Sequence, residues 1–583
     1  MKFIPSFGEF ALKCKEAFKR FPIVIIWAII GTFFTLTVIE NKNFDTPFWG
    51  KIILTFILGI SWLITTRFIT EQLPKKFQWL FLLTFSFLGI FYTSIVTTER
   101  NITEESGIRF ALYFIAGHLL LLIAPFITQW NNTTYFRYIK SVFIAIVRSL
   151  FFSLVLYLGI TLALLAIKHL FAFDFNDKRF FQMFVVCIGI VNTWIYLADF
   201  PKNIHQKTTV QYTKALEIFV KYILIPLVII YLIILYAYSF KILINWNLPK
   251  GWVSYLVIAL SFLGFLIQVL INPVQTTIDS KIIKKFTPKF YYALVPLLIL
   301  LFIAIFRRIS EYGFTENRYF VLVLAFWILG ITLYMLFSKS KKIRVFFASL
   351  AMLCVFASFG FWGAFSIATK SQIHQFKKVY NSLLTSDFVT TTKTKKQLSS
   401  ILYYLNDKKQ LTKLTPILNY NPTTTFSTLK SWELPNRILD SLQIKTTDTP
   451  LANSKYRHLN INESDLLISI KNYDFFKIMY FNNYEKDQNR IHGYFFKIIN
   501  DKNLVEISNK KQRYTIDLST KINSLSLLTQ DYNIDPAMMT IEKEWEDIAV
   551  KILFQNINLT KKNTNYTINN AQAYVFIKEK NAK

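Results

Sequence analysis

Residues 307–319 read RRISEYGFTENRY, and they stand between two apolar segments that we delimit as 290–306 and 318–337. Gly313 is placed to end a first helix, because glycine readily adopts the left-handed conformation found just past a helix C-terminus. Thr315 is placed to cap a second helix, with its hydroxyl accepting a hydrogen bond from an otherwise unpaired backbone N–H. The stretch therefore predicts a tight hairpin between two membrane-spanning helices.

The hairpin also carries an unusual amount of charge. Glu316 falls in the first turn of the second helix, where the helix dipole favours a carboxylate. The arginines of the stretch are expected at the level of the lipid headgroups, where they either pair with the nearby glutamates or bind an anion such as a lipid phosphate. Together with a lysine in the turn LPKGWVS, they form the candidate lipid- or anion-binding set: Arg307, Arg308, Arg318 and Lys250.

The whole chain of 583 residues is apolar, with 53% hydrophobic residues, 17% aromatic residues and a mean hydropathy of +0.35. The apolar residues gather in blocks near the length of about 20 residues that crosses a bilayer. We expect eleven spans, at 22–39, 49–66, 77–96, 108–127, 145–167, 180–199, 219–241, 251–271, 290–306, 318–337 and 345–366. The predicted fold class is an α-helical polytopic membrane protein followed by a soluble α+β extracytoplasmic domain.

The net charge of +31 is explained by membrane topology and not by nucleic-acid binding, because Lys and Arg concentrate in cytoplasmic loops. With the N-terminus inside, 23 of the 35 Lys and Arg residues in positions 1–366 fall on the cytoplasmic side. We therefore expect a cytoplasmic (inner) membrane protein. Eleven spans place residues 367–583 outside the cytoplasm, in the periplasm if the host has two membranes, and one span more or fewer reverses that side.

Four segments follow from these patterns. Residues 1–21 carry apolar side chains every three or four positions among lysines, which predicts a cytoplasmic amphipathic interfacial helix. Residues 22–366 form the bundle, and residues 367–455 have helical periodicity with a linker or turn at 389–396. Residues 456–583 alternate apolar and polar positions, which indicates half-buried strands. The alternation is seen at Leu466, Ile468 and Ile470, at Tyr514, Ile516 and Leu518, and at Tyr574 and Phe576.

Five motifs carry a family resemblance. They are RFP at Arg20–Pro22, LGITLAL at Leu158–Leu164, LPKGWVS at Leu248–Ser254, RISEYGFTENRY in the hairpin, and GFWGAFSIATKSQ at Gly360–Gln372. In this order, over roughly residues 10–375, the chain resembles the bacterial polytopic membrane family known as domain of unknown function 4153. The resemblance implies a polytopic membrane protein of the bacterial envelope. It implies no activity and no catalytic residue.

Polar residues deep in a span are functional candidates by default. His118 lies near the middle of the fourth span, with Gly117 beside it and Pro125 one to two turns on, and Gln268 is also at depth. A transporter or lipid flippase would use a water-accessible cavity around His118, whereas a structural histidine would bond to a neighbouring helix. The spans hold no deep Asp or Glu, which weakens the transporter interpretation.

Carboxylates in the outer loops are weaker candidates. Paired carboxylates hold a metal ion or act as a general base. A lipid-linked transferase would need those of the first outer loop to converge with those of the second, near the hairpin arginines. In a loop, the same residues are also ordinary solvated charge. The residues concerned are Glu40, Asp45, Glu104 and Glu105.

Nothing else in the chain indicates chemistry. There is no phosphate-binding glycine loop and no nucleophile elbow. The three cysteines and six histidines have no metal-ligand spacing, so we expect neither a metal nor a cofactor. The favoured interpretation is a non-enzymatic envelope scaffold or sensor. Its bundle binds membrane lipids, and its residues 367–583 bind an envelope protein or an anionic polymer. The transporter or flippase and the transferase are the alternatives.

Overall fold

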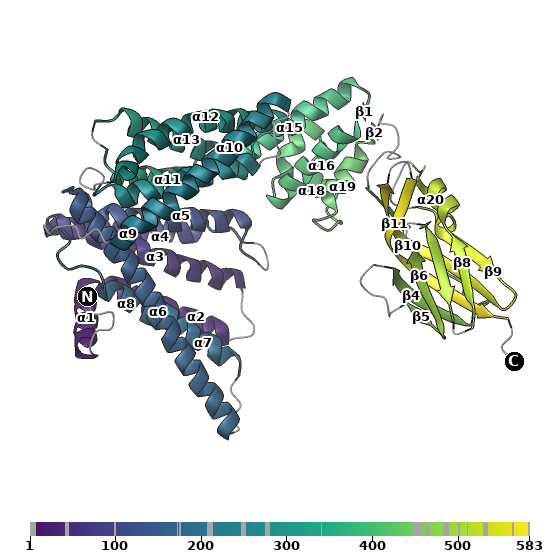
Figure 1. The fold of residues 1–583 in the computed structure, drawn as a ribbon, viewed down its shortest axis with the longest axis horizontal. Helices are drawn as coiled ribbons and strands as arrows, with labels where there is room; N and C mark the ends of the chain where they lie inside the picture. Colours follow the sequence, from purple (N-terminus) through teal and green to yellow (C-terminus); the bar gives the residue numbers. More distant parts are fainter. Residues whose placement is uncertain are drawn as a thin grey trace. The chain divides into compact units, whose positions relative to one another are not determined.

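We analysed a computed structural model of the protein (Figure 1). It describes residues 7–40, 46–97, 101–171, 173, 176–206, 214–245, 252–274, 280–339, 341–446, 456–461, 466–481, 489–499, 502–509, 511–526, 528, 534–562 and 565–580. The chain divides into two compact units, which we describe separately. The first comprises Met1–Tyr380 and Ser399–Asn436, and the second comprises Asn381–Leu398 and Arg437–Lys583.

In the described part of the first unit, ten helical segments are long and apolar enough to cross a membrane, which confirms the predicted helical membrane bundle. They are α2 (Pro22–Glu40), α3 (Thr46–Gln72), η1 (Lys75–Trp79) with α4 (Leu80–Ser94), α5 (Glu104–Ile123) with η2 (Ala124–Phe126), α6 (Asn132–Phe171), α7 (Lys178–Val186) with η3 (Cys187–Asn192) and α8 (Thr193–Ala198), α9 (Lys214–Phe219) with η4 (Val220–Leu224) and α10 (Ile225–Asn245), α11 (Trp252–Ile271), α12 (Lys281–Tyr312) and α13 (Glu316–Phe337).

The segment expected as an eleventh span, 345–366, contains a shorter helix. α14 (Arg344–Ser358) has 15 residues, which corresponds to about 22 Å at 1.5 Å per residue. The helix ends where Phe359 becomes extended (φ −140°, ψ 171°), and Gly360, with a φ of +78°, continues the turn. The chain then turns and enters α15 (Ala364–Thr385). α14 packs mainly against α5.

The predicted N-terminal amphipathic helix is present as α1 (Phe7–Arg20). It packs against α8, where Phe18 stacks on Trp194 at 6.1 Å between ring centroids. Lys13 pairs with Asp199 at 3.4 Å, and the same carboxylate pairs with Arg148 of α6 at 3.0 Å. The basic face of this helix is thus partly used for contacts with the rest of its own unit.

After α15 the chain forms short helices, as its periodicity predicts. They are α16 (Thr392–Asp407), η5 (Leu411–Leu414), α17 (Thr415–Leu418), α18 (Pro422–Thr425) and α19 (Leu434–Ser441). The linker predicted at 389–396 is wrong over its second half. Thr391 Oγ1 accepts a hydrogen bond from the N–H of Thr394 (3.3 Å) and starts α16 there. The first half is β1 (Val389–Thr390), which pairs in parallel with β2 (Lys445–Thr446).

The second unit is built mainly of antiparallel strands. One sheet has the order β3 (Tyr456–Asn460), β10 (Ile548–Lys562), β11 (Asn565–Glu579) and β4 (Phe475–Phe481), with β9 (Thr540–Glu544) also paired to β10. The other has the order β5 (Arg490–Ile491), β6 (Tyr494–Ile499), β7 (Leu504–Ser508) and β8 (Arg513–Asp517), followed by α20 (Ser519–Ser526); η8 (Pro536–Met539) precedes β9. Buried residues of both sheets form one core.

The strands expected around Tyr514 and around Tyr574 are confirmed as β8 and β11. The strand expected at residues 466–470 is wrong, because this stretch has no regular structure. Leu466 and Ile468 do pack against the core of the second unit, with Leu467 between them 96% exposed, but Ile470 is 60% exposed and the stretch is not a strand.

Candidate functional site

The turn between α12 and α13 is held by α15. Gly313 has a φ of +71°, as a glycine terminator requires, and a Cβ at this position would lie 2.8 Å from Ser371 Oγ. The Ser371 hydroxyl accepts a hydrogen bond from the N–H of Phe314 (2.8 Å). The Gln372 amide donates to the carbonyls of Tyr312 (3.1 Å) and Phe314 (2.7 Å). The motifs RISEYGFTENRY and GFWGAFSIATKSQ therefore meet, and the second satisfies backbone groups of the first.

Arg318 completes this turn from the other side. Its Nη1 donates to the carbonyls of Gly313 (2.8 Å) and Tyr312 (3.3 Å), so it neutralises the negative end of α12. Thr315 occupies the N-cap position of α13, but its hydroxyl makes no capping hydrogen bond, so that prediction is wrong. The side chain of Thr315 instead lines the cavity described below.

The other two arginines of the hairpin lie on α12. Arg307 pairs with Glu311 one turn later, at 3.2 Å, and the two side chains are 53% and 45% exposed. An exposed pair of this kind contributes about 0.3–0.5 kcal/mol. Arg308 is half-buried.

Glu316 has a role that the helix dipole does not account for. It is buried, and its Oε1 accepts a hydrogen bond from the hydroxyl of Tyr404 (3.0 Å). The same oxygen lies 3.2 Å from Lys408 Nζ, and both side chains of this ion pair are only 12% exposed. Tyr404 lies in α16 and Lys408 directly follows it. The end of α16 and the residue that follows it therefore converge on one carboxylate at the start of α13.

Lys408 also reaches the start of α5, where its Nζ lies 3.4 Å from Glu104 Oε2. The Glu104 side chain is 80% exposed, so one side of the cluster is open. Burial lowers the pKa of Lys408, but Glu316 and then Glu104 raise that pKa by more, so it lies above its ordinary value. Burial, followed by the charge of Glu316, raises the pKa of Tyr404 well above its ordinary value. Lys408 is therefore an ammonium and Tyr404 a neutral phenol at physiological pH.

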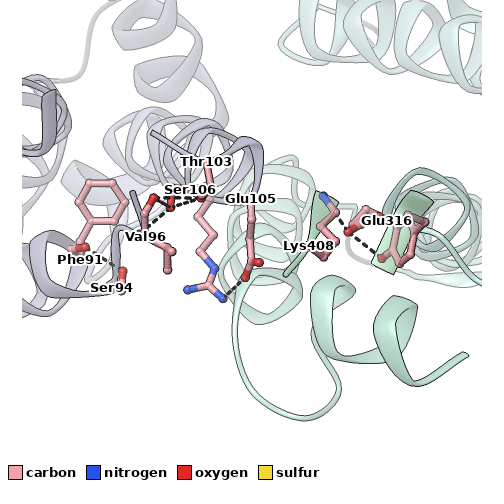
Figure 2. Close-up of polar contacts among 10 residues, drawn as sticks. Phe91, Ser94, Val96, Thr103, Glu105, Ser106, Glu316 and Lys408 are labelled. Carbon is pink, nitrogen blue, oxygen red and sulfur yellow. Dashed lines mark hydrogen bonds and ion pairs between the residues drawn. The ribbon is translucent and has the colours of Figure 1, made fainter. Parts of the chain in front are cut away.

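The start of α5 is fixed locally. Thr103 is its N-cap and accepts a hydrogen bond from the N–H of Ser106 (3.4 Å), while the Ser106 hydroxyl contacts the backbone of Val96. Glu105 pairs with Arg109 at 2.5 Å. Figure 2 shows these residues together with Lys408 and Glu316 facing each other. This capping leaves Glu104, in the first turn of α5, directed to the cluster.

A cavity of about 570 Å³ lies beside this cluster. Its apolar walls come from α5 and α13. Its polar lining comes from the starts of these two helices and from the end of α16 with the residue after it. The apolar lining residues are Ile108, Ala111, Leu112, Ile115 and Phe320, and the polar ones are Glu104, Thr315, Glu316, Asn317, Tyr404, Asp407 and Lys408. The volume is within the range of about 300–1,000 Å³ typical of small-ligand sites.

The structure brings together only some of the candidates. Glu104 joins the cluster, and Glu105 stands beside it. Glu40 lies elsewhere, with its carboxylate 2.6 Å from the amide of Gln182 and 3.5 Å from Arg179, both on α7. Lys250 of the anion-binding set and Asp45 of the acidic set lie outside the described residues. Tyr404 and Lys408 were missed, because no local pattern links them to a glutamate 88 or more residues earlier.

The two intramembrane candidates both have hydrogen-bond partners within the bundle. His118 lies on the exposed side of α5, and its Nδ1 is 2.8 Å from the carbonyl of Phe114 in the same helix. Gln268 is buried on α11, and its Oε1 accepts a hydrogen bond from the hydroxyl of Thr287 on α12 (2.6 Å). Of three cavities beside described residues, one is lined by Pro125, but none is lined by His118 or Gly117.

Fold and site thus define a multi-pass helical membrane protein with an amphipathic cavity at the end of two of its spans. The family described as "Domain of unknown function (DUF4153)" matches residues 23–395, and the chain belongs to this family. It is also 24% identical over 414 residues to an uncharacterized protein of Pasteurella multocida (strain Pm70). That match covers 70% of this chain and 66% of the relative, so the chain spans slightly less than two thirds of the relative's length. No solved structure matches the chain significantly.

Proposed function

We propose that the protein is a non-enzymatic lipid-binding sensor or scaffold of the cell envelope, and that a membrane lipid occupies the cavity between α5 and α13. One observation carries the proposal. The cavity has apolar walls from two spans, and its polar end is completed by Tyr404 and Lys408, which lie outside the spans. An acyl chain would pack on the apolar walls, and a headgroup would bind at the polar end. A bound lipid would therefore contact Tyr404 of α16 and Lys408 directly.

The charges at the polar end favour a zwitterionic lipid with a primary amine. Three carboxylates line the cavity, namely Glu104, Glu316 and Asp407, against the single ammonium of Lys408. A purely anionic headgroup is repelled by this excess of negative charge. An ethanolamine ammonium would meet Glu104 and Asp407, which face solvent, while the adjoining phosphate would meet Lys408. We therefore propose phosphatidylethanolamine as the ligand.

Contacts of the same residues support the predicted location of α16 outside the cytoplasm. Glu104 and Glu316 fall at the ends of two different predicted outer loops, and Lys408 contacts both. α14 begins at Arg344, whose guanidinium lies over Trp130 in a predicted inner loop, and the carbonyl of Trp362 accepts from Tyr319 near the outer hairpin. These contacts favour an inner-membrane protein with a cytoplasmic N-terminus and α16 outside, even though α14 is short.

The binding is tested on the full chain in lipid nanodiscs by native mass spectrometry, with phosphatidylethanolamine and phosphatidylglycerol as probes. Glu104→Gln should weaken retention of phosphatidylethanolamine several-fold, because it removes one carboxylate partner of the amine. Glu311→Gln changes an exposed glutamate away from the cavity and serves as the matched control. Equal retention of the two lipids, together with no effect of Glu104→Gln, would sink the proposed ligand.

The sensing step has its own readout. Hydrogen exchange of residues 399–407 is compared in nanodiscs made with and without phosphatidylethanolamine. Occupancy should slow exchange there, because the headgroup adds contacts to Lys408 at the end of α16. Binding of the lipid with unchanged exchange in this helix would argue for a lipid-held scaffold and against a sensor.

A further inference from the structure

The first half of α12 carries a row of lysines on one face. Lys281, Lys285 and Lys289 are spaced four residues apart, so each lies about 6 Å further along the helix axis and they form one stripe about 12 Å long. All three side chains are exposed. Across the residues that the structure describes, none of the three makes an ion pair or a side-chain hydrogen bond.

This arrangement costs stability within the helix. Like charges at i and i+4 destabilise a helix by about 0.2–0.5 kcal/mol per pair, and the row contains two such pairs. The preference for lysines in cytoplasmic loops accounts for their number, but it does not select one face of a helix. The row is therefore better explained by an anion outside the chain that lies along this face.

The lysines line an apolar groove between α10 and α12. The groove has a volume of about 480 Å³. Its α10 wall is formed by Ile225, Val228, Ile229 and Leu232, and its α12 wall by Ile282, Phe286, Phe290 and Ala293. A ligand that fills this groove has an apolar part, and a headgroup on the same ligand would reach the lysines.

The orientation of the lysine face is fixed by contacts between α12 and α11. Thr287 is buried and donates to Gln268 of α11. The ring of Phe290 lies so close to Gly264 of α11 that a Cβ there would be 1.9 Å from it. α12 therefore cannot rotate to turn its lysines away from the groove without breaking these contacts.

We propose that this groove binds an anionic glycerolipid with two phosphate groups, a diphosphatidylglycerol. One phosphate spans two neighbouring lysines at about 6 Å and leaves the third unpaired, whereas two linked phosphates match the whole stripe. Basic pockets between membrane helices on the cytoplasmic side bind headgroups of this class. The site is separate from the α5–α13 cavity, and its ligand differs in charge, so either proposal can fail alone.

The test is native mass spectrometry of the full chain with diphosphatidylglycerol and, as the probe with one phosphate, phosphatidylglycerol. Lys285→Gln should weaken diphosphatidylglycerol binding about fivefold, which is the effect of one lysine near a lipid phosphate. Lys284→Gln is the matched control, because Lys284 is the adjacent exposed lysine but does not line the groove. The triple change of Lys281, Lys285 and Lys289 to Gln should abolish the preference for two phosphates.

Folding is controlled by Lys285→Arg, which keeps the charge and should keep most of the binding. Retention of binding in the triple variant overturns the proposal. So does an equal loss in Lys284→Gln and Lys285→Gln, because it indicates a general charge effect. Equal affinity of the wild type for the two probe lipids also overturns it, because the row would then recognise only a single phosphate.

Discussion

Lys408→Ala is the sharpest perturbation of the cluster. It leaves the carboxylate of Glu316, which is buried and 3.2 Å from the lost ammonium, without its cation. Removing one partner of a buried ion pair typically costs about 3–5 kcal/mol. Tyr404 keeps its hydrogen bond to Glu316, and both side chains of the pair retain 12% exposure. We therefore expect the lower end of this range, about 3 kcal/mol.

The loss should appear first as opening of α16, because Tyr404 and Lys408 tie its C-terminal end to the start of α13. A change of about 3 kcal/mol raises the population of the opened form on the order of a hundredfold. Hydrogen exchange of residues 399–407, measured on the full chain in nanodiscs, should accelerate by this factor. Lys413→Ala, an exposed lysine on η5, is the control and should change exchange little.

A double-mutant cycle separates the ion pair from lost packing. Glu316→Gln should cost less than Lys408→Ala, because Lys408 keeps Glu104 as a partner. The double variant should be more stable than Lys408→Ala alone, since no unpaired buried charge remains, and we expect a coupling of about 2 kcal/mol. Equal exchange in Lys408→Ala and Lys413→Ala, or a coupling near zero, would refute the reasoning.

Further outcomes follow from the same contacts. Gly313→Ala should destabilise the chain by about 1–3 kcal/mol in thermal unfolding, because of its positive φ and the close contacts with α15, whereas Gly330→Ala, in open space on α13, should change stability by under about 1 kcal/mol. Thr287→Val should cost about 1–3 kcal/mol because it removes the hydroxyl that donates to the buried Gln268 amide oxygen, and adding Gln268→Leu should recover much of this loss. The pKa of Lys408 is raised in the folded chain. Its contribution to stability is therefore fully present below its unfolded pKa of about 10.4 and is lost as the pH rises through the folded pKa. Protection of α16 from hydrogen exchange, corrected for intrinsic exchange, should be constant from about pH 6 to pH 9.

Features that depend on local pattern could be predicted from the sequence. The apolar blocks located ten long helices, because a span is recognised by length and composition alone. The end of α12 at Gly313 was predicted because glycine readily adopts the positive φ that ends this helix. The end of α14 at Ser358 was not predicted, because the residues that follow are as apolar as the helix itself and the helix ends through the backbone conformations of Phe359 and Gly360.

Features that depend on distant contacts could not be predicted. Glu316 was assigned to the helix dipole, although its strongest partner follows α16. Such a pair has no fixed spacing, and Lys408 is one of many lysines in a chain rich in them. The strand expected at residues 466–470 failed for a related reason. Alternation placed Leu466 and Ile468 correctly against a core, but it does not show that the backbone pairs with a neighbouring strand.

Two charged residues of the hairpin RRISEYGFTENRY have different roles: Arg318 stabilises the turn, and Glu316 binds Lys408. Arg318 caps the carbonyls of its own turn, and α15 fixes the same turn through Ser371 and Gln372. This clamp sets the position of the next residues, including Glu316, which in turn holds Lys408 at the cavity. A change in Ser371 or Gln372 should consequently alter the polar end of the cavity without touching any ligand. The motifs RISEYGFTENRY and GFWGAFSIATKSQ thus act together, and their shared effect is to position the buried carboxylate of Glu316.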